Sequence, residues 1–120
     1  MSDKINPKHY TSHQSGIECI EIFRHSTACR AAAIKYLWRC GQKDAVQDEL
    51  KKALWYVKDE LKHNAQAYLS SRQVDSLIEV LGELQKYQDA NTHKLFYDII
   101  FGYEPQLKQA ISTIEDMINE

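Results

Sequence analysis

The sequence of 120 residues contains few residues that interrupt helices or cross-link chains. It has four glycines, two prolines and three cysteines, and no Asn-Gly or Asp-Gly pair that would mark a tight hairpin between strands. Apolar residues recur instead at intervals of three and four, which is the spacing of amphipathic helices. We therefore expect an all-α fold, in which a single domain forms a compact bundle of five to six helices with an extended N-terminal arm.

Several functional motifs are also missing. No run of about 18 apolar residues could cross a membrane, and the polar start MSDKINPKHYTSH lacks the apolar core of a secretion signal. The chain has no G-x-x-x-x-G-K-[ST] phosphate loop, no G-x-S-x-G and no H-E-x-x-H. The missing apolar segments predict a cytoplasmic protein without a membrane partner. The missing motifs predict that it has no zinc site and no phosphate loop of the Walker type.

The cysteines are odd in number, and none of them forms a C-x-x-C pair. Cys19, Cys29 and Cys40 are spaced 10 and 11 residues apart. In a cytoplasmic protein such residues are typically reduced and act as small apolar side chains. We expect half-buried thiols here, not disulfides or a nucleophile.

The first half of the chain holds three expected helices after the arm of residues 1–14. The pair Ser15 and Glu18 matches a capping box and predicts a helix over 16–25. Ser26 or Thr27 is expected to cap a second helix that reaches residue 40, with Gly41 as its stop. Asp44 stands where the cap of a third helix over 45–69 belongs, and that helix carries the apolar stripe Leu50, Leu54, Val57 and Leu61.

Three further helices are expected in the second half. Ser70 or Ser71 caps the fourth, Asn91 or Thr92 opens the fifth, and Pro105 starts the last. Their apolar stripes are Val74, Leu77, Ile78, Leu81 and Leu84, then Leu95, Phe96, Ile99 and Ile100, then Leu107, Ile111, Ile114 and Ile118. The last stripe is narrow, as in bundles and coiled coils, so we expect a homo-oligomer.

Charge is divided unequally between the two halves. Residues 1–64 hold 11 Lys and Arg against 8 Asp and Glu, a net charge of +3, whereas residues 65–120 hold 4 against 9, a net of −5. A surplus of this size is too small for duplex nucleic acid but suits a small anionic ligand. We expect the first half to hold the binding site and the acidic second half to serve as scaffold or oligomer interface.

The segment 33–44, AIKYLWRCGQKD, combines cations with large aromatic side chains. Lys35 and Arg39 lie four residues apart on one side of the second helix, with Trp38 beside them. In the third helix Lys51 precedes Trp55 by four residues and Lys52 precedes Tyr56 by four. A hairpin through residues 41–44 would bring these groups together.

A nucleotide would use both kinds of side chain. Its base stacks on Trp or Tyr, and its phosphates bind Lys, Arg and the free N–H groups of a helix start such as the one after Lys43. Gly41 would let a phosphate approach closely, and His9 is a candidate acid or base. The alternative from spacing alone is that the rings form hairpin core and the lysines a solvated face. Glu18 and Glu21 form an E-x-x-E pair that could hold magnesium, although Glu18 already has a capping role.

Four blocks in order, NPKHY, GIECIEIF, AIKYLWRCGQKD and ELKKALWYVKDEL, span about residues 6–61. Together they resemble a small phage-encoded family that includes the nucleotide (dNMP) kinase of T7-like phages. One departure is that relatives often place Gly-Asn shortly before the AIKYLWR-like block, where this chain has Arg30-Ala31-Ala32. The positions that match the family are His9, Tyr10, Gly16, Glu18, Cys19, Lys35, Tyr36, Trp38, Arg39, Gly41, Lys43, Lys52, Trp55 and Tyr56.

The resemblance implies a phage enzyme of the host cell cytoplasm that transfers phosphate from ATP or another NTP to a dNMP, with magnesium as the implied metal. We expect Lys35, Arg39 and His9 as catalytic residues. We expect the nucleotide to contact Tyr10, Tyr36, Trp38, Gly41, Lys43, Lys52, Trp55 and Tyr56.

Three alternatives remain open at this point. The protein could bind or sequester nucleotides without turnover, or serve as a purely structural adaptor. It could also be an all-α NTP pyrophosphohydrolase, although the E-x-x-D motif of such enzymes is missing here.

Overall fold

The computed structural model describes residues 13–42, 45–63 and 69–120. Within these ranges the chain is helical and contains no strand, which confirms the all-α prediction. Most of the expected N-terminal arm and the expected cap Asp44 lie outside the described residues, as do His9, Tyr10 and Lys43. The elements are α2 (Cys19–Phe23), α3 (Ala28–Trp38), α4 (Val46–His63), α5 (Ser71–Leu84), the 3-10 turn η1 (Gln85–Tyr87), α6 (Ala90–Phe101) and α7 (Glu104–Ile118).

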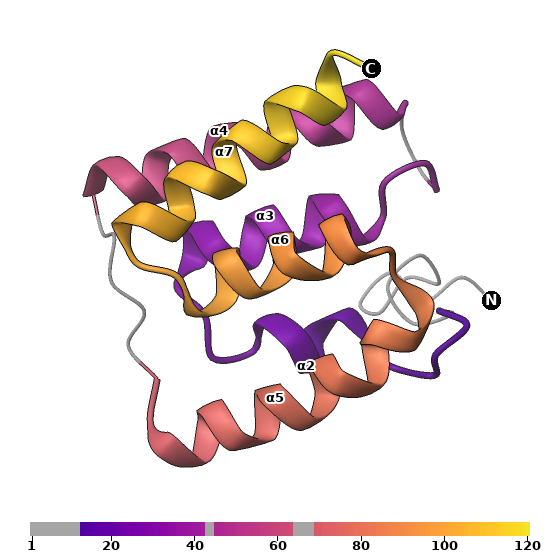
Figure 1. Cartoon of the computed structure of the whole chain (residues 1–120), viewed down its shortest axis with the longest axis vertical. Coiled ribbons are helices and arrows are strands. Elements are labelled where there is room, and N and C mark those ends of the chain that lie inside the picture. Colours follow the sequence, from indigo (N-terminus) through magenta and orange to yellow (C-terminus); the bar gives the residue numbers. More distant parts are fainter. Residues whose placement is uncertain (1–12, 43–44, 64–68) are drawn as a thin grey trace, which may run out of the picture.

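The helices form two layers that follow the order of the sequence. In the first layer α3 lies between α2 and α4, and each of these three helices packs against one helix of the second layer (Figure 1). The pairs are α2 with α5, α3 with α6 and α4 with α7. Because α3 and α4 are consecutive and pack along each other, the segment rich in cations and aromatics forms a helical hairpin.

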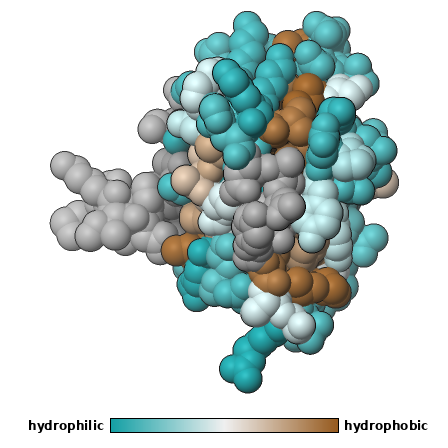
Figure 2. All heavy atoms as spheres, turned by 90° about the vertical axis from the view of Figure 1, so that its left-hand side faces the viewer, coloured by the Kyte–Doolittle hydropathy of each residue, from teal (hydrophilic) through white to brown (hydrophobic). Residues whose placement is uncertain are grey.

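Most residues of the apolar stripes that the sequence predicts pack between the layers, but Ile78 of α5 is 48% exposed. Leu95, Phe96, Ile99 and Ile100 are all buried, and the other helices contribute Leu50, Val57, Leu77, Leu81, Leu84, Leu107 and Ile114. Figure 2 shows that hydrophilic residues cover most of one side of the molecule. The seam of α7 packs against α4 and α6 of the same chain, so this seam is already covered, and homo-oligomerisation stays a prediction.

Three helix ends differ from the prediction. The first described helix begins at Cys19, not at residue 16, because Gly16 has φ +78°, which is incompatible with a right-handed helix. Its capping glutamate is Glu21, whose Oε2 accepts from the Glu18 N–H at 2.5 Å, whereas Ser15 Oγ accepts from the Ile17 N–H. The predicted Ser15 capping box is therefore wrong.

The other two differences concern the ends of the third and fifth helices. The helix predicted over 45–69 is described over Val46–His63, and Leu69 is not helical. The fifth helix is capped by Asp89, not by Asn91 or Thr92, because Asp89 Oδ1 accepts from the Thr92 N–H at 2.8 Å. This bond also lowers the pKa of Asp89. The predicted cap Ser70 is confirmed, whereas Thr27 occupies the N-cap position of α3 but its hydroxyl donates to Glu60 and does not cap the helix.

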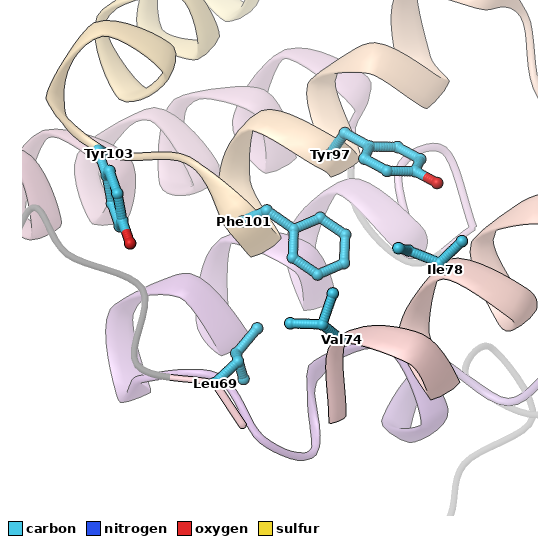
Figure 3. Close-up of a pocket in the computed structure, with 6 residues that line it drawn as sticks. All are labelled: Leu69, Val74, Ile78, Tyr97, Phe101 and Tyr103. Atoms are coloured by element: carbon cyan, nitrogen blue, oxygen red, sulfur yellow. The ribbon is translucent and has the colours of Figure 1, made fainter. Parts of the chain in front are cut away.

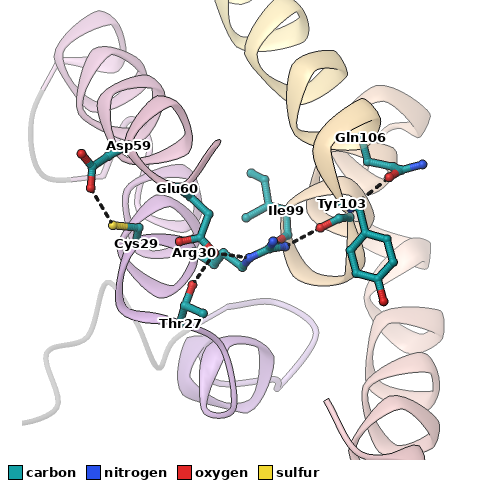
Figure 4. A network of polar contacts seen from close by, with 9 residues as sticks. Thr27, Cys29, Arg30, Asp59, Glu60, Ile99, Tyr103 and Gln106 are labelled. Carbon is teal, nitrogen blue, oxygen red and sulfur yellow. Dashed lines mark hydrogen bonds and ion pairs between the residues drawn. The ribbon is translucent and has the colours of Figure 1, made fainter. Parts of the chain in front are cut away.

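Two buried ion pairs join α3 to α4, and the sequence did not indicate them. Arg39 Nε lies 2.5 Å from Glu49 Oε2 near the turn, and Arg30 Nε lies 2.5 Å from Glu60 Oε2 at the other end of the hairpin. Arg30 also donates to the carbonyl oxygens of Ile99 and Gly102 at 2.9 and 2.8 Å (Figure 4). The hairpin is thereby tied to the corner between α6 and α7.

None of the helices in the described part of the chain is long and apolar enough to span a bilayer.

Candidate functional site

Aromatic side chains of α3 and α4 meet on the hairpin. The rings of Tyr36 and Tyr56 are stacked, with centroids 5.8 Å apart and planes inclined by 16°. Trp55 stands edge-on to Tyr56 at 5.0 Å. Trp55 is 61% exposed, so most of its indole is accessible to a ligand. We call the group Tyr36, Lys52, Trp55 and Tyr56 the aromatic face.

Positive charge lies directly beside these rings. The Arg39 guanidinium carbon is 4.7 Å from the centre of the Tyr36 ring, and Lys52 Nζ is 5.5 Å from the same centre. Both cations also face Glu49, which is completely buried; its carboxylate lies 2.5 Å from Arg39 Nε and 3.7 Å from Lys52 Nζ. Two cations and one buried carboxylate thus lie next to the stacked tyrosines.

Lys35 lies on the same side of α3 as Arg39 but contacts a different neighbour. Its Nζ is 5.3 Å from the centre of the Phe23 ring in α2, and the side chain is exposed. The hairpin therefore brings Tyr36, Arg39, Lys52, Trp55 and Tyr56 together, with Lys35 at the edge that faces α2. The catalytic roles proposed for Lys35 and Arg39 stay predictions.

Trp38 occupies a different environment from Trp55. It is only 6% exposed and packs between His13, at a centroid distance of 4.7 Å, and Phe96, at 6.3 Å. Its buried Nε1 has no hydrogen-bond acceptor in the described part of the chain. Since Trp38 belongs to the core, Trp55 is the tryptophan that a ligand can reach.

Gly41 follows α3 as the stop that the sequence predicts. It is exposed and has φ +82°, a conformation that favours glycine, and a Cβ there would lie 3.5 Å from Val46. The positive φ of the turn is by itself a sufficient reason for a glycine at this position. Its contact with a phosphate stays a prediction.

The cysteines are free thiols with raised pKa values. Burial raises the pKa of Cys19 to about 12, and burial together with the hydrogen bond to Asp59 raises that of Cys29 to about 11. Burial and the nearby Glu49 also raise the pKa of Cys40. Because only the thiolate is an effective nucleophile, none of them is set up for nucleophilic catalysis at neutral pH.

The described residues do not form a metal site of their own. Glu21 caps α2, and within residues 13–42, 45–63 and 69–120 no three His, Cys, Asp or Glu side chains lie close enough together to hold a metal ion. The expected magnesium would be held, at least in part, by the phosphates of its nucleotide.

Glu49 was missed by the sequence reasoning. The buried positions of α4 are Glu49, Leu50, Ala53, Val57 and Glu60, so two glutamates share the inner side with apolar residues. A glutamate at each end of an apolar stripe was the available signal. It predicts buried counter-ions on the neighbouring helix, and these are Arg39 and Arg30.

One comparison with known proteins gives a match in the region of the site. Residues 4–58 match the model of DUF3310, which is described as a protein family of unknown function. The match covers nearly the same residues as the four sequence blocks and contains α2, α3 and most of α4, including the aromatic face. No curated protein and no solved structure matches the chain.

Proposed function

We propose that this protein binds a nucleotide on the aromatic face and transfers a phosphoryl group from a nucleoside triphosphate to a deoxynucleoside monophosphate. The observation that carries the proposal is the exposed indole of Trp55, which stands edge-on to Tyr56 on the same helix as Lys52. A purely structural cluster would gain more by burying this indole. The resemblance of the blocks to phage nucleotide kinases supports the choice of reaction.

The base would stack on Trp55, an interaction that contributes about 1 to 3 kcal/mol in proteins that bind single bases. The phosphates would then extend toward Lys52 and, across α3, toward Lys35. Phosphoryl transfer depends mainly on positioning and on cations that neutralise the charge spread over the phosphate oxygens. Magnesium bound to the nucleotide would supply further positive charge.

Arg39 supports this face in a different way. Its Nε and one terminal nitrogen are directed at Glu49, at 2.5 and 3.4 Å. Removing the arginine would leave a buried carboxylate without its main counter-ion, which costs about 3 to 5 kcal/mol. An inactive Arg39→Ala protein would therefore not distinguish catalysis from folding, whereas Arg39→Lys keeps the charge beside Glu49 and is the better variant.

Binding can be followed through tryptophan fluorescence, because the two indoles differ in exposure. We expect dNMPs and ATP to quench the emission of the wild-type protein and to leave that of Trp55→Phe, which retains only Trp38, unchanged. In calorimetry Trp55→Ala should lose about 1 to 3 kcal/mol of binding free energy. Tyr87→Ala, which truncates another exposed ring, is the control. Quenching that persists in Trp55→Phe would contradict binding at this face.

The reaction is tested by incubating the protein with ATP, Mg²⁺ and each dNMP and separating the products by anion-exchange chromatography. We expect a dNDP and ADP, with turnover lowered about 100-fold in Lys52→Ala or Lys35→Ala. Lys58→Ala is the matched control, because Lys58 also lies on α4 but faces Glu115 of α7. A bound but unaltered dNMP would identify a binding protein, and release of pyrophosphate would identify a pyrophosphohydrolase.

A further inference from the structure

A groove separates α5 from α6, and none of the residues that line it belongs to the aromatic face. The two helices are consecutive, but α5 packs on α2 while α6 packs on α3 and α7. The space between them is a cavity of about 310 Å³ lined by Leu69, Val74, Ile78, Tyr97, Phe101 and Tyr103 (Figure 3). Phe101 lies in the middle of this set, with Tyr97 on one side and Leu69 on the other.

A second hollow adjoins the first and shares three of its aromatic residues. It measures about 360 Å³ and is lined by Tyr97, Asp98, Phe101, Gly102, Tyr103 and Gln106. The groove thus has an apolar, aromatic part and a part with polar groups. Small-molecule sites commonly have this composition and a volume of about 300 to 1,000 Å³.

The polar groups of the second hollow are incompletely paired. Asp98 is 7% exposed, and its Oδ2 accepts from Lys94 Nζ at 2.8 Å. Within the described part of the chain Asp98 Oδ1 has no hydrogen-bond donor. Gln106 Oε1 accepts from the Tyr103 N–H at 2.9 Å, which leaves the NH₂ group of the same side chain to donate. The hollow therefore offers one acceptor and one donor beside aromatic rings.

We propose that this groove binds the base of a nucleoside. A nucleobase is flat enough to lie against Tyr97, Phe101 or Tyr103, and its edge carries an N–H donor next to an acceptor atom. The N–H would donate to Asp98 Oδ1, and the neighbouring ring nitrogen or carbonyl would accept from Gln106. Lys94 already balances the charge of Asp98, so a neutral ligand fits better than a cation.

The groove does not suit the phosphates of a nucleotide. The carboxylate of Asp98 lines it, Glu104 lies next to Tyr103, and Lys108 is engaged with Glu104 at 3.1 Å. We therefore expect a nucleoside to bind more tightly than its monophosphate, which is the reverse of the order expected at the aromatic face. The two sites share no residue, so either one can fail without the other.

The proposal is tested by titrating ¹⁵N-labelled protein separately with adenosine and cytidine and following the backbone amide signals by NMR. We expect the largest shifts in residues 74–78, 97–103 and 106. Purine riboside, which lacks the exocyclic amino group of adenosine, should bind about tenfold more weakly, the effect of losing one hydrogen bond to a charged group.

Two variants test the groove, and a third is the control. Tyr103→Ala removes a ring that is 56% exposed, and Gln106→Glu keeps an acceptor for the Tyr103 N–H but removes the donor. Each should weaken adenosine binding about tenfold or more. Lys58→Ala should leave it unchanged, because Lys58 lies on α4 and faces Glu115 of α7. Absence of shifts with both nucleosides, shifts confined to the aromatic face, or equal binding of adenosine and purine riboside would overturn the proposal.

Discussion

Arg30→Met tests the connection between the hairpin and the second layer. Arg30 is 1% exposed, and its guanidinium contacts Glu60 on α4 and the carbonyl oxygens of Ile99 and Gly102 at the end of α6. Methionine has a similar length and is apolar, so the substitution removes the charge and the donors while leaving most of the volume. The Glu60 carboxylate, which is 3% exposed, would then keep Thr27 Oγ1 as a neutral donor at 2.8 Å.

The expected loss is large because a buried charge is left without its counter-ion. Removing one partner of a buried ion pair costs about 3 to 5 kcal/mol. For a domain of this size such a loss corresponds to a decrease in Tm of roughly 10 to 20 °C. The double variant Arg30→Met/Glu60→Leu removes both charges, and replacing a whole buried pair by apolar residues is often neutral or stabilising. We therefore expect it to recover most of the lost stability.

Urea unfolding followed by circular dichroism measures these differences, and a constant m value would show that the unfolding transition itself is unchanged. Lys108→Ala is the control, because Lys108 pairs with Glu104 at the surface and such a pair contributes less than about 1 kcal/mol. A loss below about 1 kcal/mol for Arg30→Met, or a double variant as unstable as the single one, would refute the reasoning.

Two further predictions concern glycine and histidine. Gly102→Ala should lower the free energy of unfolding, measured in urea, by about 2 kcal/mol or more, because the new Cβ would overlap the Asp98 carbonyl oxygen. Gly82→Ala, in open space on α5, should raise it by about 0.5 to 1 kcal/mol. Equal effects of the two substitutions would contradict this prediction. Burial lowers the pKa of His13 and His93 below 6.5, so the unfolded chain binds more protons than the folded one. The free energy of unfolding should therefore fall as the pH drops below 6.5, and a slope unchanged in His13→Phe/His93→Phe would argue against these two groups.

Periodicity predicted the helices of the second layer well. In α6 the residues Leu95, Phe96, Ile99 and Ile100 are all buried, and Pro105 stands in the first turn of α7. Such helices have one apolar side and one polar side, so the buried side follows from spacing alone. One error lies inside α5, where Ile78 is exposed, and another lies at the start of α6, where the choice among Asp89, Asn91 and Thr92 depends on the path of the preceding chain.

The same reasoning could not decide the position of Trp38. Helix α3 is in contact with α2, α4 and α6, so it has buried residues on several sides. The spacing of its apolar residues therefore does not indicate a single buried side. Lys35 is exposed and Tyr36 is half-buried, whereas Arg39 is buried against Glu49 and Trp38 reaches Phe96 of α6. That outcome depends on how the second layer packs on the first, which is a long-range property.

Arg30 has a structural role that its place in the sequence does not reveal. A positive charge at this position would ordinarily predict a surface or a ligand contact. In the structure it is buried, and Glu60 and two carbonyl groups of the α6–α7 corner satisfy it. Since the acidic partner comes from another helix, the sequence around Arg30 contains no local signal for this role.

The two buried glutamates also constrain how the aromatic face can work. Glu49 holds Arg39 at the end of α3, and Glu60 holds Arg30 near its start, so the hairpin is fixed at both ends. Tyr36 and Tyr56 lie along the hairpin between these two ion pairs and are stacked on each other. A base that binds to Trp55 therefore meets a surface that is already ordered, and little conformational entropy is lost on binding. The side chain that must still rearrange is Lys52, because phosphate oxygens would compete with Glu49 for its ammonium group.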